Sequence, residues 1–148
     1  MLETSNKSIG NQFEQDLARL LADAGFWVHV LQQNKAGQPA DLIVAKGRYA
    51  TLIDCKVIST EKGFPLSRVE ENQKLSMASF CKRTGTPCWF AFRLPDGDIQ
   101  FMSAAALDCF ASSDVKRIPN DDIWIIGIPL CEWISYAEIA GREDGDEC

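Results

Sequence analysis

The amino-acid sequence predicts an α/β domain in which helices flank a mixed central β-sheet. Three observations support this prediction. Apolar residues recur at helical spacing from Gly10 to Ala24. The segment 41–56 then reads as two apolar strands joined by a tight turn around Gly47, and a further strand, Cys88–Leu94, follows a second helical segment. Helices that alternate with strands along 148 residues indicate one α/β domain that is long enough to bury a core.

The first part of the chain divides into a helix, a strand and this hairpin. The helix spans Gly10 to Ala24, and Gly25 ends it because glycine readily adopts the left-handed conformation of a helix cap. Its inward face comprises Phe13, Leu17, Leu20, Leu21 and Ala24. Phe26 to Leu31 is rich in aromatic and β-branched residues, which predicts a strand. A polar loop, Gln32 to Pro39, leads into the hairpin.

The middle of the chain begins with an expected loop from Ser59 to Ser67. A helix from about Arg68 to Arg83 follows, with Ser67 as its cap and Glu70 three residues on, as in a capping box. Its expected core face comprises Val69, Leu75, Met77 or Ala78, and Cys81. Cys88–Leu94 then forms a hairpin with Ile99–Met102.

The C-terminal part is expected to contain a helix from Ser103 to Phe110, a strand from Ile123 to Ile128 and a helix from Trp133 to Ala140. We therefore predict a single domain over residues 1–148. Its core covers about 9–102, its C-terminal extension about 103–140 and its acidic tail 141–148.

Composition excludes several classes of protein. No window approaches the roughly 18 apolar residues that a membrane span needs, and the N-terminus lacks the pattern of a signal peptide. The sequence thus predicts a cytoplasmic protein without a membrane partner. Its six cysteines form no C-x-x-C pair and there is one histidine, His29, so a zinc site is not expected and the cysteines should be reduced thiols. His29 lies in an apolar strand and is expected to be packed or at an edge.

The net charge of −6 hides an uneven distribution. Residues 1–93 hold 12 Lys and Arg against 9 Asp and Glu, whereas residues 94–148 hold 3 against 12. Screening limits the reach of surface charge to about 10 Å, so a phosphate backbone responds to local charge rather than to the total. The N-terminal part is therefore compatible with nucleic-acid binding.

The hairpin carries a candidate catalytic site. Asp41 opens its first strand, and Asp54 and Lys56 lie two residues apart near the end of the second, so they share a face. With Glu14 from the first helix and the backbone carbonyl of Cys55, these carboxylates offer the hard oxygen ligands that Mg²⁺ prefers, and Mn²⁺ is expected to substitute. Lys56 would orient or help to deprotonate the attacking water, or stabilise the oxyanion. This combination favours phosphodiester hydrolysis.

Each of these residues has a simpler interpretation when it is taken alone. An aspartate at a strand start is often a turn or cap residue, D-x-K occurs by chance in many chains, and a lone glutamate in a helix is usually solvated. The order of an acid in the first helix, an aspartate before an apolar strand and D-x-K at the end of its hairpin partner is more specific. That order is the basis of the nuclease hypothesis.

The same order resembles the PD-(D/E)xK nuclease superfamily, and within it Holliday junction resolvases of the archaeal and bacterial RecU types. The resemblance covers about residues 9–94, through GNQFEQDLARLLADAGF, PADLIV, LIDCK and FPLSRVEENQ. It implies a restriction-endonuclease-like core and a metal site of Glu14, Asp41, Asp54 and Lys56, with Gln73 pointing into that site. This chain departs from the pattern in three ways. Pro39 precedes Asp41 by two residues, Asp54 replaces the more frequent glutamate, and no segment matches the stalk of the RecU type.

Such an enzyme would act on branched DNA. Candidate DNA contacts are Lys35, Ser59, Lys62, Arg68 and Lys74. Two symmetric cuts across a junction need two active sites, so a homodimer is expected. Its interface could draw on Phe80, Trp89, Phe90 and Phe92. Two alternatives stay open: a repair or phage nuclease that acts on flap, nicked or linear DNA, and a non-catalytic DNA-binding or assembly module.

Overall fold

A six-stranded mixed sheet forms the centre of the protein in the computed structural model, which describes residues 6–32 and 37–142. Its strands are β1 (Trp27–Val30), β2 (Leu42–Lys46), β3 (Tyr49–Val57), β5 (Trp89–Arg93), β6 (Ile99–Ser103) and β8 (Ile128–Pro129), in the order β1-β2-β3-β5-β6-β8. Only β3 and β5 pair in parallel. The parallel pair requires a crossover, which the segment 58–88 provides.

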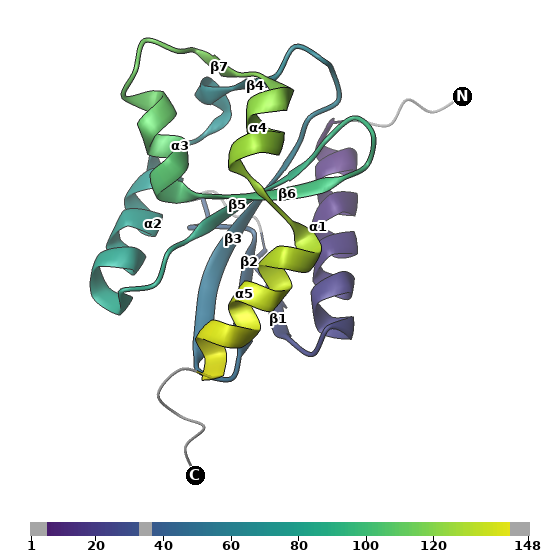
Figure 1. The fold of residues 1–148 in the computed structure, drawn as a ribbon, viewed down its shortest axis with the longest axis vertical. Coiled ribbons are helices and arrows are strands. Elements are labelled where there is room, and N and C mark those ends of the chain that lie inside the picture. The colour runs from purple at the N-terminus through teal and green to yellow at the C-terminus, as the bar shows by residue number, and fades with distance from the viewer. Residues whose placement is uncertain (1–5, 33–36, 143–148) are drawn as a thin grey trace.

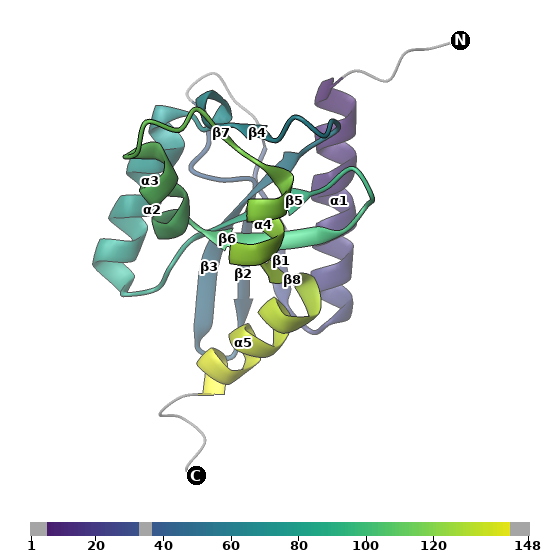
Figure 2. The same ribbon diagram turned by 45° about the horizontal axis from the view of Figure 1, so that its top comes forward.

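Helices cover both faces of this sheet, as Figures 1 and 2 show. On one side lie α1 (Asn6–Asp23) and α5 (Leu130–Arg142), whose apolar residues share a core cluster. On the other side lie α2 (Glu71–Thr84), α3 (Ala104–Ala111) and α4 (Asn120–Ile126), which contribute to a second cluster. A two-stranded sheet of β4 (Phe64–Pro65) and β7 (Arg117–Ile118) and a 3-10 turn (Leu66–Arg68) complete the crossover region. The predicted α/β class with a mixed sheet is confirmed.

Trp133 joins α5 to the sheet. Its side chain is fully buried, and its ring stacks on Phe101 of β6 with 4.5 Å between centroids. Phe26, just before β1, stacks on it at 5.6 Å, and Trp89 of β5 meets it edge-on at 6.2 Å. Aromatic pairs in these geometries add to the gain from burial. The C-terminal helix thereby becomes part of the main core.

The turn of the β2–β3 hairpin is fixed by a close approach to α5. Gly47 has a φ of 60°, and a Cβ atom there would lie 2.7 Å from the carbonyl oxygen of Gly141. The backbone N–H of Arg48 donates to the same carbonyl at 3.0 Å. Glycine is needed at this position both for the left-handed backbone and for the space. The turn sets the pairing of the two strands that carry the candidate site.

The expected strand at 123–128 is wrong. Residues 120–126 form α4, and only Ile128–Pro129 joins the sheet. Ile123 is buried, whereas the next three apolar residues, Trp124, Ile125 and Ile126, are exposed. Acids at Asp121 and Asp122 favour a helix because they lie in its positive first turn. The apolar residues from Ile123 to Ile126 therefore belong to a helix that buries only Ile123.

The second helix starts later than expected. Ser67 lies in the 3-10 turn, and the N-cap of α2 is Glu70, whose side chain accepts a hydrogen bond from the backbone N–H of Gln73. The predicted inward position of Leu75 is also wrong, since that residue is 63% exposed. Ala78 and Cys81 are exposed as well, whereas Gln73 and Met77 are the buried residues of α2. Of the predicted core face, Val69 and Met77 are therefore buried, whereas Leu75, Ala78 and Cys81 are not.

The aromatic residues proposed for a dimer interface are mostly core residues. Trp89, Phe90 and Phe92 are at most 5% exposed, because β5 lies in the middle of the sheet with helices on both faces. Only Phe80 of α2 is half-buried. The five cysteines of the described segments are free thiols. No helix in those segments is long and apolar enough to span a membrane.

Candidate active site

Two aspartates from the hairpin strands lie close together. The pairing of β2 with β3 ends at Leu42 and Ile53, and the backbone N–H of Asp41 also donates to the carbonyl of Ile53 at 3.1 Å. Asp41 and Asp54 both line one cavity, and the charge of Asp41 acts on the Asp54 carboxyl, so the two side chains are neighbours. Both are buried, Asp41 at 7% exposure and Asp54 at 0%.

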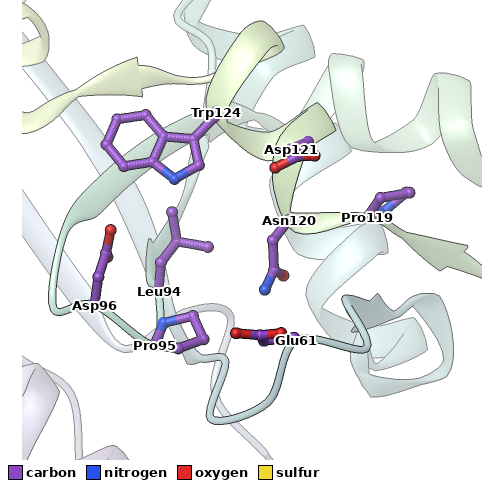
Figure 3. A pocket seen from close by; sticks show the side chains of 8 residues that line it. All are labelled: Glu61, Leu94, Pro95, Asp96, Pro119, Asn120, Asp121 and Trp124. Carbon is purple, nitrogen blue, oxygen red and sulfur yellow. The ribbon is translucent and has the colours of Figure 1, made fainter.

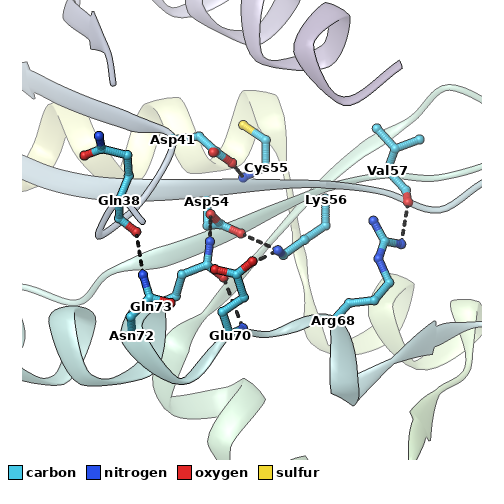
Figure 4. A network of polar contacts seen from close by, with 10 residues as sticks. All are labelled: Gln38, Asp41, Asp54, Cys55, Lys56, Val57, Arg68, Glu70, Asn72 and Gln73. Carbon is cyan, nitrogen blue, oxygen red and sulfur yellow. Dashed lines mark hydrogen bonds and ion pairs between the residues drawn. The ribbon is translucent and has the colours of Figure 1, made fainter. Parts of the chain in front are cut away.

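Asp54 is held by the lysine of the same strand and by a glutamine of α2 (Figure 4). Its Oδ2 lies 3.0 Å from Lys56 Nζ, and its Oδ1 accepts a hydrogen bond from Gln73 Nε2 at 2.7 Å. Gln73 Oε1 in turn lies 3.5 Å from Lys56 Nζ. Asp54 Oδ2 is buried, and the Lys56 ammonium is the charge that it faces. Gln73 therefore positions both Asp54 and Lys56.

Glu14 of α1 joins the two aspartates. Burial raises the pKa of Glu14 to about 7, and the charge of Asp41 and a hydrogen bond with it contribute to this rise. Burial likewise raises the pKa of Asp54 to about 8, with a further contribution from Asp41, whereas Lys56 opposes the shift. Three carboxylates are thus brought together with a single ammonium group. The raised pKa values of Glu14 and Asp54 reflect burial first and then the negative charge of Asp41 beside them.

The cluster lines a small polar cavity of about 180 Å³. Its wall comprises Glu14, Gln38, Asp41, Asp54, Cys55, Lys56, Glu70 and Gln73. Buried carboxylate oxygens, the raised pKa values of Glu14 and Asp54 and a polar wall all fit a divalent cation, which prefers carboxylate oxygens. As placed, no three Asp, Glu, His or Cys side chains of the described residues converge on one point at ligand distance.

The backbone of Cys55 faces the same cavity. Its N–H donates to Asp41 Oδ2 at 2.7 Å, which ties the carboxylate to β3. The N–H and C=O of one strand residue point toward the same neighbouring strand. The carbonyl of Cys55 therefore also points to the side of Asp41, where β2 no longer pairs with β3. This is the position expected for an additional oxygen ligand.

The structure brings only part of the proposed DNA-contact set near this cavity. Lys35 lies outside the described residues. Ser59 and Arg68 line an adjoining cavity, whereas Lys62 is exposed in the loop after β3 and lines neither of these two cavities. Lys74 lies on the side of α2 that faces α3, beside a different, largely apolar cavity. Among the sequence-based candidates, Lys74 is thus placed away from the carboxylates.

Two residues of the cavity were not proposed as site residues from the sequence. Glu70 is the N-cap of α2, and its backbone N–H lies 3.4 Å from Gln73 Oε1. Gln38 belongs to the loop before β2, and its carbonyl accepts a hydrogen bond from Asn72 at 3.3 Å. The spacing of Glu70 and Gln73 matches a capping box, so the sequence carried a signal for the first residue. Nothing in the pattern of the loop marks the second.

A larger cavity lies elsewhere (Figure 3). It has a volume of about 670 Å³, and its wall comprises Glu61, Leu94, Pro95, Asp96, Pro119, Asn120, Asp121 and Trp124. Three of these residues are acidic and none is a lysine or arginine. A surface of this charge repels phosphate groups, so it does not suit DNA.

Comparisons with known proteins indicate a family and a fold. The family model described as archaeal Holliday junction resolvase (Hjc) matches residues 5–138. Among solved structures, Hjc from the archaeal hyperthermophile Archaeoglobus fulgidus, a Holliday junction resolvase, has a TM-score of 0.65 at 21% identity, and the match covers 84% of this chain and 99% of that one. The structure of SSO0001 has a TM-score of 0.39 at 16% identity over 90% of this chain and 68% of that one, which supports no argument. No curated protein sequence matches the chain.

Proposed function

The chain belongs to the archaeal Holliday junction resolvase family, a family of endonucleases, and we propose that it cuts four-way junctions by metal-dependent hydrolysis at the cavity of Glu14, Asp41, Asp54 and Lys56. The observation that carries this proposal is the gathering of three carboxylates beside one lysine. Burial and mutual repulsion raise the pKa values of Glu14 and Asp54. Nothing in the packing of the core requires such an arrangement, whereas a divalent cation would stabilise it.

Glu14, Asp41, Asp54 and the carbonyl of Cys55 would hold the ion, which we propose to be Mg²⁺, with Mn²⁺ as a substitute. When bound, the ion supplies Lewis-acid stabilisation of the charge that develops on the scissile phosphate. The cavity accommodates the ion and one phosphate oxygen, because its volume is about 180 Å³. Asp41 is held to the backbone of Cys55 at 2.7 Å, so that carboxylate is already oriented before substrate binds.

Lys56 acts on the phosphate or on the attacking water. Its side chain is 12% exposed, and its Nζ lies between Asp54 Oδ2 and Gln73 Oε1. An ammonium has three donors, so beside these two contacts it can donate to a water or to an oxyanion in the cavity. Gln73 acts through its neighbours: its amide fixes the distance between Asp54 and Lys56.

The direct test is cleavage of a synthetic four-way junction beside a linear duplex of matched sequence, with Mg²⁺, with Mn²⁺ and with EDTA. Paired symmetric nicks in the junction alone, lost in EDTA, are the expected result. Equal cutting of the linear duplex would leave a nuclease without junction specificity. Cutting that persists in EDTA would refute the metal-dependent mechanism.

We further propose that the chain acts as a homodimer over a single nuclease domain, since two symmetric cuts need two active sites. Most of the aromatic residues first considered for the interface are buried inside one copy. The interface must therefore use another surface. Sedimentation equilibrium of the free protein tests the dimer, and a mass of one chain at micromolar concentration would exclude it.

A further inference from the structure

A second cavity adjoins the carboxylate cavity. It has a volume of about 290 Å³ and is lined by Ile9, Gly10, Cys55, Val57, Ser59 and Arg68. Cys55 lines both cavities, so they share a wall. On α1, Gly10 precedes Glu14 by one turn and lies on the same face of the helix. The second cavity therefore continues the first along both α1 and β3.

Both cavities lie along the same open edge of β3. The pairing with β2 ends at Leu42 and Ile53, beyond which the backbone groups of Cys55 and Val57 face no strand of the described residues. The carboxylate of Asp41 accepts a hydrogen bond from the N–H of Cys55, and Arg68 donates one to the carbonyl of Val57. These two positions are two residues apart, which is about 7 Å along a strand. An extended DNA strand that follows this edge passes from the carboxylates to Arg68.

Arg68 is held in place although its side chain is exposed to solvent. Its Nη1 donates to Val57 O at 2.8 Å (Figure 4). Its guanidinium carbon lies 5.3 Å from the centre of the Phe64 ring. None of the ion pairs found among the described residues includes Arg68. A guanidinium has five N–H donors in a fixed plane, and one of them accounts for the bond to Val57. The others remain available to a ligand in the cavity.

We propose that this cavity binds the DNA phosphate next to the scissile one, with Arg68 and Ser59 as its donors. The inference rests on the proposed function and extends it from the reacting phosphate to its neighbour. Three carboxylates repel the DNA backbone at the point of cleavage, so an adjacent cation is needed to hold the strand there. Hydrogen bonds between a guanidinium and a phosphate are charge-assisted and fix the geometry of the strand.

Gly10 leaves room for that phosphate. A Cβ atom built at Gly10 meets no other atom within 4 Å, so a side chain at this position would extend into open space. The substitution Gly10→Leu should therefore fill the cavity without a clash in the folded protein. It gives a way to block the subsite that does not change any charged group.

The cleavage position is first mapped on an unmodified four-way junction with Mg²⁺. In a series of junctions, one phosphate near that position is then replaced by a neutral methylphosphonate. Binding is then measured in EDTA for the wild type, Arg68→Gln, Arg68→Lys and Gly10→Leu. Arg142→Gln serves as the matched control, because Arg142 is exposed at the end of α5 on the other side of the sheet from α2.

The wild type and Arg142→Gln should lose affinity several-fold when the adjacent phosphate is neutral. Arg68→Gln and Gly10→Leu should bind the unmodified junction more weakly than the wild type. Their affinity should not fall further when the adjacent phosphate is neutral. Arg68→Gln should also lower the slope of log affinity against log salt by about one, whereas Arg68→Lys should keep it. Thermal unfolding of Gly10→Leu at or above the wild-type temperature would confirm that its loss of binding is local.

The same methylphosphonate scan distinguishes a failure of the phosphate subsite from a failure of the proposed function. If the wild type cuts junctions and Arg68→Gln responds to every methylphosphonate as the wild type does, the phosphate subsite is wrong and the proposed function stands. If the wild type neither cuts nor binds junctions, the proposed function fails and the subsite fails with it.

Discussion

Among the described residues, Lys56 is the one cation that lines the carboxylate cavity, and its ammonium lies 3.0 Å from Asp54 Oδ2. Replacement of Lys56 by methionine keeps the length of the side chain and removes the charge. We expect single-turnover cleavage of a junction to fall by about 10²-fold or more, which is the usual effect of losing one electrostatic donor at a reacting oxyanion. Junction affinity should change only a few-fold. Lys82→Met, on the exposed distal end of α2, is the control, and a Lys56→Met variant that cuts at the wild-type rate would contradict this role.

The carboxylates also predict how stability depends on pH. The folded-state pKa of Asp54 is about 8 against an ordinary value of 3.8, and that of Glu14 is about 7 against 4.5. The folded protein therefore binds more protons than the unfolded chain between about pH 4 and pH 8. Because stability falls with pH wherever the folded state binds the extra protons, the free energy of unfolding should decrease across this window in EDTA.

Urea unfolding at pH 5, 6.5 and 8 tests this expectation. Asp54→Asn removes one of the three carboxylates, so its stability should fall less steeply with pH than that of the wild type. Asp114→Asn, a change at an exposed residue outside the cavity, should leave the slope unaltered. Added Mg²⁺ should flatten the wild-type curve, since a cation favours the ionised carboxylates. If stability falls equally steeply with pH in the wild type and in Asp54→Asn, protonation of Asp54 does not contribute to the pH dependence.

At the scale of elements, the β2–β3 hairpin depends on its turn. Gly47→Ala places a Cβ 2.7 Å from the carbonyl of Gly141 at a φ of 60°. Gly97→Ala has comparable backbone strain, with φ of 94°, but its Cβ meets no atom within 4 Å. We expect Gly47→Ala to lower the free energy of unfolding by roughly 1–3 kcal/mol, and by more than Gly97→Ala. If urea titrations show equal losses of unfolding free energy for the two variants, the close approach of α5 to the turn does not add to the cost of Gly47→Ala.

The same hairpin shows how far local pattern determines structure. Asp54 and Lys56 share a face because side chains alternate along a strand, and this was readable from the sequence. The apolar run at 123–128 was ambiguous, because short runs fit a buried strand and a helix equally well. Tertiary context decided in favour of α4, which buries Ile123 and leaves Trp124, Ile125 and Ile126 exposed. The start of α2 was similarly decided by which acid, Glu70, reached the N–H of Gln73.

At the scale of the whole molecule, the core must hold α1, the hairpin and α2 in a fixed relation. Trp133 links α5 to β5, β6 and the segment before β1. Trp133→Ala should lower the free energy of unfolding by about 3–5 kcal/mol, because a fully buried indole leaves a large cavity. Trp124→Ala removes a side chain that is 42% exposed and should cost much less. Similar unfolding midpoints for the two variants would show that α5 does not contribute to the cooperative core.

The sequence by itself determined the α/β class, the hairpin and the positions of Asp41, Asp54 and Lys56 on it. These features depend on periodicity and turn residues, which act over a few neighbouring residues. Only the tertiary structure decided that Glu14 lies beside Asp41, that Gln73 rather than Leu75 turns inward, and that Lys74 turns away from the carboxylates. Each of these depends on how a helix is rotated and placed against the sheet. Side-chain packing on both faces of the sheet sets that rotation, and no local pattern encodes it.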